Sequence, residues 1–360
     1  MTRGSRWARY TAEQPSSRAR EIDCEILVRF RAWHGTVHAK GMDVAEQVWA
    51  AESDILPADS RVPMQDCLSP DELTETRAAL LGPDSDLLIE TMFRLALDRP
   101  LELAHEPAVA VATQQRWLAG ATRAFTPVGR LVADSLREYQ FWLDRGRKMH
   151  IEDGEPAFGA ERYAGKAVLE TGSGFGCNLF SFSRVGGRFV GLEPVAVYRQ
   201  LTPILAEREG LTPPAVVDGQ AESMPFADAE FDIVFCYSAH QYMDVRRAIA
   251  EMARVLKPGG QLQIIGGTLG VFAKDQWREP LTRRRVGLLK DYVLTIANTV
   301  AYERLGRRLH VPRSGFTSAP IYPRYRYMAK WMSERGLQVR HDLRRRVARV
   351  ETTFIADKPT

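Results

Sequence analysis

The feature that most constrains this chain is a set of three glycines at alternate positions, Gly172, Gly174 and Gly176. They follow a short apolar run that ends in Glu170. Glycine adopts positive φ and lets the backbone approach a ligand without a Cβ in the way, and the helix expected next points unpaired N–H groups at that ligand. A second apolar run ends in Glu193, where a carboxylate can accept hydrogen bonds from ribose hydroxyls. This order predicts a nucleoside-binding strand–loop–helix–strand unit.

The glycine spacing distinguishes two classes of cofactor. A dinucleotide site requires G-x-G-x-x-G, and counting from Gly172 its third glycine would fall at Cys177. Glu170, at the end of the strand, would repel a phosphate and attract an ammonium group. S-adenosylmethionine (SAM) has no phosphate and carries an α-amino group. The pattern therefore predicts a SAM site.

The rest of this region continues the same alternation of strands and helices. The expected elements are a strand over 215–218, a strand over 231–236, a helix over 245–256 and a strand over 261–265. With the glycine loop, residues 164–267 resemble the core of class I SAM-dependent methyltransferases, in the branch with VLE-x-G-x-G-x-G, P-F…F-D and L-K-P-G-G motifs. The resemblance implies a Rossmann-like sheet of seven strands, mostly parallel, with a C-terminal antiparallel hairpin.

The resemblance also implies where the cofactor is held. The expected cofactor-binding residues are Glu170, Gly172, Gly174, Gly176, Glu193, Gln220, Ala221 and Glu222. Gln220 departs from the family pattern, which commonly has an Asp at this place to take the adenine amino group. A glutamine carbonyl accepts the same hydrogen bond, so we expect adenine recognition to be weaker or differently set rather than lost.

His240 is the first candidate for a general base, which the reaction needs only if the acceptor carries a proton. It follows the fourth strand, in a loop that faces the sulfonium in this fold, and its pKa range suits proton transfer near neutrality. The alternative is a histidine that packs or hydrogen-bonds the loop. Tyr237 and Tyr242 are candidates for lining the substrate side, with aromatic packing as their alternative.

Other chemistries match this loop poorly. Cys236 lacks the Pro-Cys context of cytosine C5-methyltransferases and is interpreted as a small buried hydrophobe. The loop reads Tyr-Ser-Ala-His, without the Asn/Asp-Pro-Pro-Tyr/Phe sequence used for methylation of adenine or glutamine amino groups. Asp244 alone does not make a metal site of the catechol type. The four cysteines are scattered, which argues against zinc and against a disulfide framework. We expect no metal.

The core accounts for only part of the 360 residues. We expect an N-terminal, mainly helical domain over 1–125 and the methyltransferase domain over 126–360. The helices expected before the core are 21–33, 69–81 with Ser69 as its cap, 86–97, 108–119 and 129–145. The N-terminal domain would cover the active site, contact the substrate or form a homodimer.

An insertion of helical character, 268–322, separates the fifth strand from a helix expected over 323–335. Its apolar positions 286, 289, 293, 296 and 300 follow one helical face. Because ligands of open α/β folds bind at this edge of the sheet, we interpret the insertion as a substrate lid. The expected hairpin pairs 337–343 with 350–356.

Positive charge is concentrated late in the chain. Residues 268–349 contain nineteen lysines and arginines and six acidic residues, a net charge of +13. The arginines considered as ligands for an anionic substrate or nucleic acid are Arg283, Arg284, Arg285, Arg307, Arg308, Arg344, Arg345 and Arg346. The alternative is a solvated basic face. No recognisable RNA-binding module accompanies the core, so nucleic acid is not favoured.

The sequence thus favours an enzyme that methylates an oxygen or nitrogen atom of a small or medium-sized metabolite, with an anionic acceptor as one option. The alternative is a non-catalytic member of the fold that binds SAM or a protein partner. No run approaches eighteen apolar residues, and residues 1–20 lack the apolar core of a secretory signal. The expected location is the cytoplasm.

Overall fold

The structure is a computed structural model. It describes residues 67–148, 160–275, 286–307, 320–344, 346–347 and 351–360. All of them belong to one compact unit, Ser60–Thr360. The helix expected over 21–33 lies outside the described residues.

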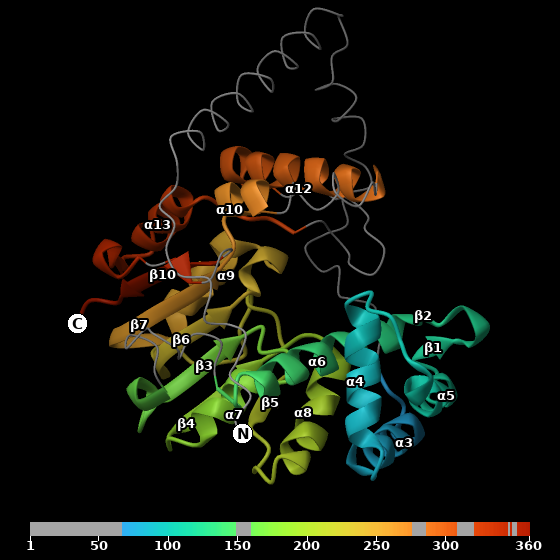
Figure 1. Ribbon diagram of the computed structural model, residues 1–360. Helices are drawn as coiled ribbons and strands as arrows, with labels where there is room; N and C mark the ends of the chain where they lie inside the picture. The colour runs from blue at the N-terminus through green and yellow to red at the C-terminus, as the bar shows by residue number, and fades with distance from the viewer. Residues whose placement is uncertain (1–66, 149–159, 276–285, 308–319, 345, 348–350) are drawn as a thin grey trace, which may run out of the picture. The chain divides into compact units, whose positions relative to one another are not determined.

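A mixed sheet forms the centre of this unit (Figure 1). Its strands are β3 (Ala167–Thr171), β4 (Arg188–Leu192), β5 (Ala215–Val217), β6 (Phe231–Tyr237), β7 (Leu256–Gly266), β8 (Gln338–Val339), β9 (Arg346–Val347) and β10 (Glu351–Asp357). The order is β5-β4-β3-β6-β7-β10-β8, with β9 also paired to β10. The five strands β3 to β7 are parallel to one another, whereas β10 is antiparallel to both β7 and β8. The expected mostly parallel sheet with a C-terminal antiparallel hairpin is confirmed.

The parallel strands read as continuous apolar runs because helices cover both faces of the sheet. In β3, the buried Val168 packs in one cluster with Phe182 of α7 (Cys177–Ser183). Its neighbour Leu169 points to the other face and packs in a cluster with Ile249 of α9 (Val245–Val255). Alternate side chains of one short strand therefore join two separate hydrophobic cores.

The helices before the sheet lie close to where the sequence predicts them, except that the helix expected over 108–119 ends at Gln114 and residues 118–119 form a strand. They are α3 (Pro70–Leu81), α4 (Ser85–Ala96), α5 (Glu106–Gln114) and α6 (Pro127–Asp144). Ser69 caps α3 as expected, in a capping box in which Glu72 N donates to the Ser69 hydroxyl and Ser69 N donates to the Glu72 carboxylate. A short antiparallel pair, β1 (Leu118–Ala119) with β2 (Ala124–Phe125), connects α5 to α6.

These helices share a hydrophobic core with helices of the sheet layer, α7 and α8 (Ala196–Arg208). The buried Trp142 of α6 donates from Nε1 to Ser181 Oγ of α7 at 3.0 Å. Arg208 of α8 donates to the carbonyl oxygen of Leu80, at the end of α3, at 2.9 Å. The division of the chain at residue 125 stays a proposal.

The insertion and the C-terminal part contribute three described α-helices, α10 (Leu269–Asp275), α12 (Val286–Leu305) and α13 (Tyr325–Ser333). Helix α12 spans all five positions of the predicted apolar face, and α13 lies within the predicted 323–335 helix. Met328 and Trp331 of α13 are buried in the same cluster as α9, so this helix covers the α9 side of the sheet.

Candidate functional site

The glycine loop lies at the carboxyl end of β3. Gly172, Gly174 and Gly176 all have positive φ, at +67°, +57° and +94°. A Cβ on Gly172 would lie 2.4 Å from the Cβ of Ala239, in the loop after β6, so Gly172 allows two loops to touch. A Cβ on Gly174 would have no atom within 4 Å. Gly172 is therefore needed by the protein itself, whereas Gly174 faces open space that a ligand can fill.

Glu193 follows β4 and fastens this loop. Its Oε2 accepts from Gly174 N at 2.9 Å, and its Oε1 accepts from Val195 N at 2.9 Å. The residue is only 4% exposed, and burial raises the pKa of its carboxyl to about 7. Each carboxylate oxygen keeps a further lone pair, so Glu193 can hold the loop and still accept from ribose hydroxyls.

Glu170, at the end of β3 and next to the glycine loop, has a carboxylate oxygen without a hydrogen-bond donor among the described residues. Asn178 of α7 donates from Nδ2 to Glu170 Oε1 at 2.6 Å. The buried Oε2 has no hydrogen-bond partner among the described residues. Burial, with a smaller contribution from the nearby charge of Glu193, raises the pKa of this carboxyl to about 8. A buried acceptor without a donor is costly, so this site fits a ligand that brings a cationic donor, such as the ammonium group of SAM.

Asn178 was not predicted from the sequence. It lies eight residues after Glu170, and only the turn made by the glycine loop brings the two side chains together. An amide in the first turn of the helix after such a loop is the signal that would have indicated it.

The segment expected to hold the adenine forms a tight turn after β5. Ser223 N donates to Gln220 O at 3.1 Å, and Ala221 is buried. Glu222 Oε1 accepts from Asp244 N, the cap of α9, at 2.5 Å. These contacts connect the expected adenine segment to the loop after β6. The adenine contact expected of Gln220 stays a prediction.

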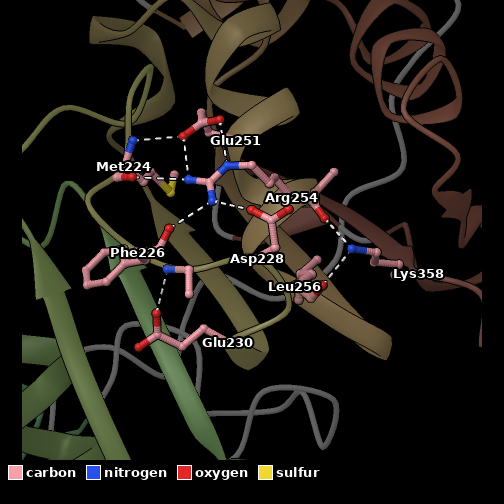
Figure 2. A network of polar contacts seen from close by, with 10 residues as sticks. Met224, Phe226, Asp228, Glu230, Glu251, Arg254, Leu256 and Lys358 are labelled. Carbon is pink, nitrogen blue, oxygen red and sulfur yellow. Dashed lines mark hydrogen bonds and ion pairs between the residues drawn. The ribbon is translucent and has the colours of Figure 1, made fainter.

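Arg254 of α9 holds the chain that follows this turn (Figure 2). Its guanidinium donates to both carboxylate oxygens of Glu251, at 2.9 and 2.8 Å, and to Asp228 Oδ1 at 2.7 Å. It also donates to the carbonyl oxygens of Phe226, at 2.8 Å, and Met224, at 3.1 Å. All five N–H groups are used, so this arginine shapes the Pro-Phe segment that the sequence marked only as a motif.

His240 begins the short 3-10 helix η5 (His240–Tyr242), between the ends of β6 and β7. The side chain is fully buried, and Nε2 lies 3.2 Å from the carbonyl oxygen of Gly267. A Cβ on Gly266 would lie 2.2 Å from the imidazole, so the two residues fit closely. Burial lowers the pKa of His240 to about 4. The imidazole is therefore neutral at physiological pH, and its Nδ1 has no described partner. Its role as a base stays a prediction.

The two candidate substrate tyrosines differ in their surroundings. The ring of Tyr237 stacks on Phe235, with centroids 6.5 Å apart and an interplanar angle of 9°. Tyr242 is 51% exposed. Cys236 is buried, and burial raises the pKa of its thiol to about 11, as expected of a small hydrophobe rather than a nucleophile. The substrate roles of both tyrosines stay predictions.

Within the part of the chain that the structure describes, no group of three or more His, Cys, Asp and Glu side chains could hold a metal ion. Of the arginines considered as ligands, Arg307 and Arg344 have described side chains, and both are exposed. The side chains of the other six lie outside the described set. A hollow of about 210 Å³ lined by Arg162, Lys166 and Pro258 lies at the amino ends of the strands, opposite the glycine loop, and is not the nucleoside site.

The strand order and the glycine loop at the carboxyl ends of the strands define a Rossmann-like nucleoside-binding fold. Residues 169–264 match the family model described as "Methyltransferase domain". The chain carries a class I SAM-dependent methyltransferase domain, and this domain implies SAM as its cofactor.

Curated relatives match the same region. Over 153 residues the chain is 31% identical to "Uncharacterized methyltransferase YcgJ" of Bacillus subtilis. This alignment covers 40% of the present chain and 60% of YcgJ. Over 129 residues the chain is 36% identical to demethylmenaquinone methyltransferase of Thermobifida fusca. This alignment covers 34% of the present chain and 52% of the relative. The chain thus spans about half to three fifths of the length of these relatives.

Solved structures are similar at low identity. That of YcgJ from Bacillus subtilis aligns with a TM-score of 0.38 and 17% identity, over 55% of this chain and 93% of the other. A SAM-dependent methyltransferase of Aquifex aeolicus aligns with a TM-score of 0.38 and 16% identity, over 57% and 94%.

The raised pKa values of Glu170 and Glu193 predict a pH-dependent stabilisation by SAM. In the free protein both carboxyls have folded pKa values above their unfolded ones, so their contribution to stability is present below about pH 4.5 and is lost as the pH rises through about 7 and 8. A cationic, hydroxyl-bearing ligand favours the ionised forms. We expect the affinity for SAM to rise by about tenfold or more from pH 6 to pH 8.

Thermal shift and calorimetric titration across this pH range measure the effect, because the difference in Tm with and without SAM cancels the other titrating groups. The Glu170→Gln variant is the control and should flatten most of the rise. A SAM affinity that is equal at pH 6 and pH 8 in the unmodified protein would contradict the assignment.

Proposed function

We propose that this chain is a methyltransferase that transfers the methyl group of SAM to an oxygen or nitrogen atom of a small or medium-sized metabolite. The observation that carries the proposal is the buried Glu170 oxygen without a donor, beside a loop whose central glycine faces open space. When bound, SAM supplies an activated methyl group on a sulfonium, so the protein mainly has to position the two reactants. The name of the Thermobifida fusca relative supports a small-molecule acceptor.

Different residues would bind different parts of SAM. Glu170, with Asn178 holding one of its oxygens, would take the ammonium group, and Glu193 would take the ribose hydroxyls. Gly172 lets the loop after β6 approach, and Gly174 leaves the room that the ligand fills. The segment Gln220–Glu222 would hold the adenine.

His240 is the proposed base for an acceptor that carries a proton. Burial lowers its pKa to about 4, so the expectation of a pKa near neutrality is wrong: the ring is neutral but is a weak base, and its Nδ1 is not used by any described residue. Because the ring is buried, the loop of η5 has to move for a substrate to reach it. The net charge of +13 over 268–349 supports an anionic acceptor. A homodimer through the N-terminal helices and a cytoplasmic location also stay proposals.

A non-catalytic SAM-binding protein is the second candidate, favoured by Gln220 at the place of the family's Asp. Turnover distinguishes the two functions. The purified chain is incubated with SAM and a small-molecule fraction of cell extract, and release of S-adenosylhomocysteine is measured. The proposal predicts release that depends on the extract and that is absent in Gly174→Arg. No release above that variant, with SAM binding intact in the unmodified chain, would favour the non-catalytic function.

A further inference from the structure

Helix α12 of the insertion buries a row of side chains that carry polar groups. The row consists of Thr295, Asn298, Thr299, Tyr302 and Glu303. These residues are spaced three and four apart, so they lie along one side of the helix. Because buried polar groups need hydrogen-bond partners, the partners of this row indicate which parts of the protein α12 holds in place.

One partner is the extended segment that follows the insertion. The hydroxyl of Thr299 accepts from Tyr322 N at 3.0 Å. The preceding residue, Ile321, donates from its N to the carbonyl oxygen of Gln241 in η5, also at 3.0 Å. Through this segment α12 is joined to the loop that carries His240.

Tyr302 joins the same row to the first turn of α9. Its hydroxyl donates to Asp244 Oδ1 at 2.5 Å and accepts from Arg246 N at 2.9 Å. As the cap of the helix, Asp244 Oδ1 also accepts from Arg247 N, at 3.3 Å. The first N–H groups of a helix have no partner within the helix. Tyr302 and Asp244 together therefore supply acceptors for two of them.

The cap residue is also bonded to the segment expected to hold the adenine. Asp244 N donates to Glu222 Oε1 at 2.5 Å. Glu222 directly follows Ala221, which is buried in the turn after β5. A chain of hydrogen bonds thus runs from Tyr302 in the insertion, through Asp244, to the expected adenine segment.

We propose that Tyr302 is a positioning residue for SAM: it fixes Asp244, and Asp244 fixes Glu222 and the turn that holds the adenine. The inference rests on the proposed SAM site and adds that the insertion takes part in cofactor binding. Tyr302 acts through Asp244 and does not have to touch the cofactor. Its ring packs edge-on against Trp331, with centroids 5.5 Å apart, so a phenylalanine keeps this packing and removes only the hydroxyl.

Calorimetric titration of SAM into the full chain and into Tyr302→Phe tests the proposal. We expect the variant to bind SAM about three- to tenfold more weakly, because the loss of one hydrogen bond to a carboxylate loosens the turn. Tyr163→Phe is the matched control. Tyr163 is fully buried and donates its hydroxyl to Gln263 Oε1 at 2.6 Å, but it precedes β3, whereas the glycine loop follows that strand. Urea unfolding should show both variants destabilised, while SAM affinity should fall only in Tyr302→Phe.

A second background distinguishes positioning from a general loosening of the fold. In Glu222→Ala, where the link to the turn is removed, Tyr302→Phe should lower SAM affinity by less than about twofold. Equal losses in the two backgrounds, or a loss in Tyr163→Phe as large as in Tyr302→Phe, would overturn the proposal. SAM binding that Tyr302→Phe leaves unchanged would overturn it too, and would leave the proposed function intact. If the unmodified chain does not bind SAM, the proposed SAM site fails together with this inference.

Discussion

Replacing His240 by alanine is expected to lower kcat by about 10²- to 10⁴-fold, the usual range for loss of a general base. SAM affinity should survive, because Gly174 and Glu193, which we propose to hold the cofactor, hydrogen-bond to each other, whereas the imidazole hydrogen-bonds to the carbonyl oxygen of Gly267. Since the pKa of His240 is lowered to about 4, the acid limb of the kcat profile should lie near pH 4 rather than near 6.5. Steady-state kinetics from pH 4 to pH 8 measure both effects.

A substitution at Gly266, which packs against His240, distinguishes a catalytic role of the histidine from a packing role. A Cβ on Gly266 would displace the imidazole, so Gly266→Ala should lower the Tm and should do so less in a His240→Ala background. If His240→Ala keeps near-normal turnover and an unchanged pH profile, and loses only stability, the residue serves packing alone. The reaction then depends on alignment of the reactants.

Replacing Gly129 by alanine is expected to destabilise the protein by about 3 kcal/mol or more, at the upper end for overpacking. The glycine lies in the first turn of α6, where its N–H donates to the hydroxyl of the cap Thr126 at 2.9 Å. An alanine Cβ there would lie 1.8 Å from the carbonyl oxygen of Trp117, a backbone atom that cannot rotate away. Helix α6 would have to move off the shared core.

Urea unfolding of both forms measures this effect. Gly270→Ala is the control, because its Cβ would meet no atom within 4 Å and it lies within α10. That exchange should be neutral or stabilise by up to about 1 kcal/mol. A Gly129→Ala protein as stable as the control variant would show that α6 does not pack against Trp117 as described.

The sheet could be predicted from the sequence because its strands are buried on both faces. An apolar run with no alternation, ended by an acid or a glycine, marks β3 and β4 to within two residues. Helix α8 was not predicted. Pro203 stands inside it, and a proline ordinarily ends a helix. The strand β7 also begins earlier than expected, since Lys257–Gly260 continue it instead of forming only a turn.

The candidate site could be predicted only at positions where the residue type and its place in the fold together indicate a single role. Gly174 and Glu193 follow from their places in the loop and at the strand end, and a 2.9 Å hydrogen bond joins them in the structure. Asn178 and Arg254 could not be predicted, because their partners are set by tertiary contacts that leave no local pattern. For the same reason the spacing along α12 predicted a helix but not that Thr295, Asn298 and Thr299 would be buried.

Calorimetric titration of SAM into the full chain and into Gly174→Arg tests the central claim most directly. Gly174 faces open space, so the protein can accommodate the arginine at the modest cost of a positive φ, while the side chain fills the room meant for the ligand. We predict saturable binding at one site by the unmodified chain and no measurable binding by a variant whose circular dichroism is unchanged. No binding by the unmodified chain, or equal binding by the variant, would contradict the assignment of this loop as the SAM site.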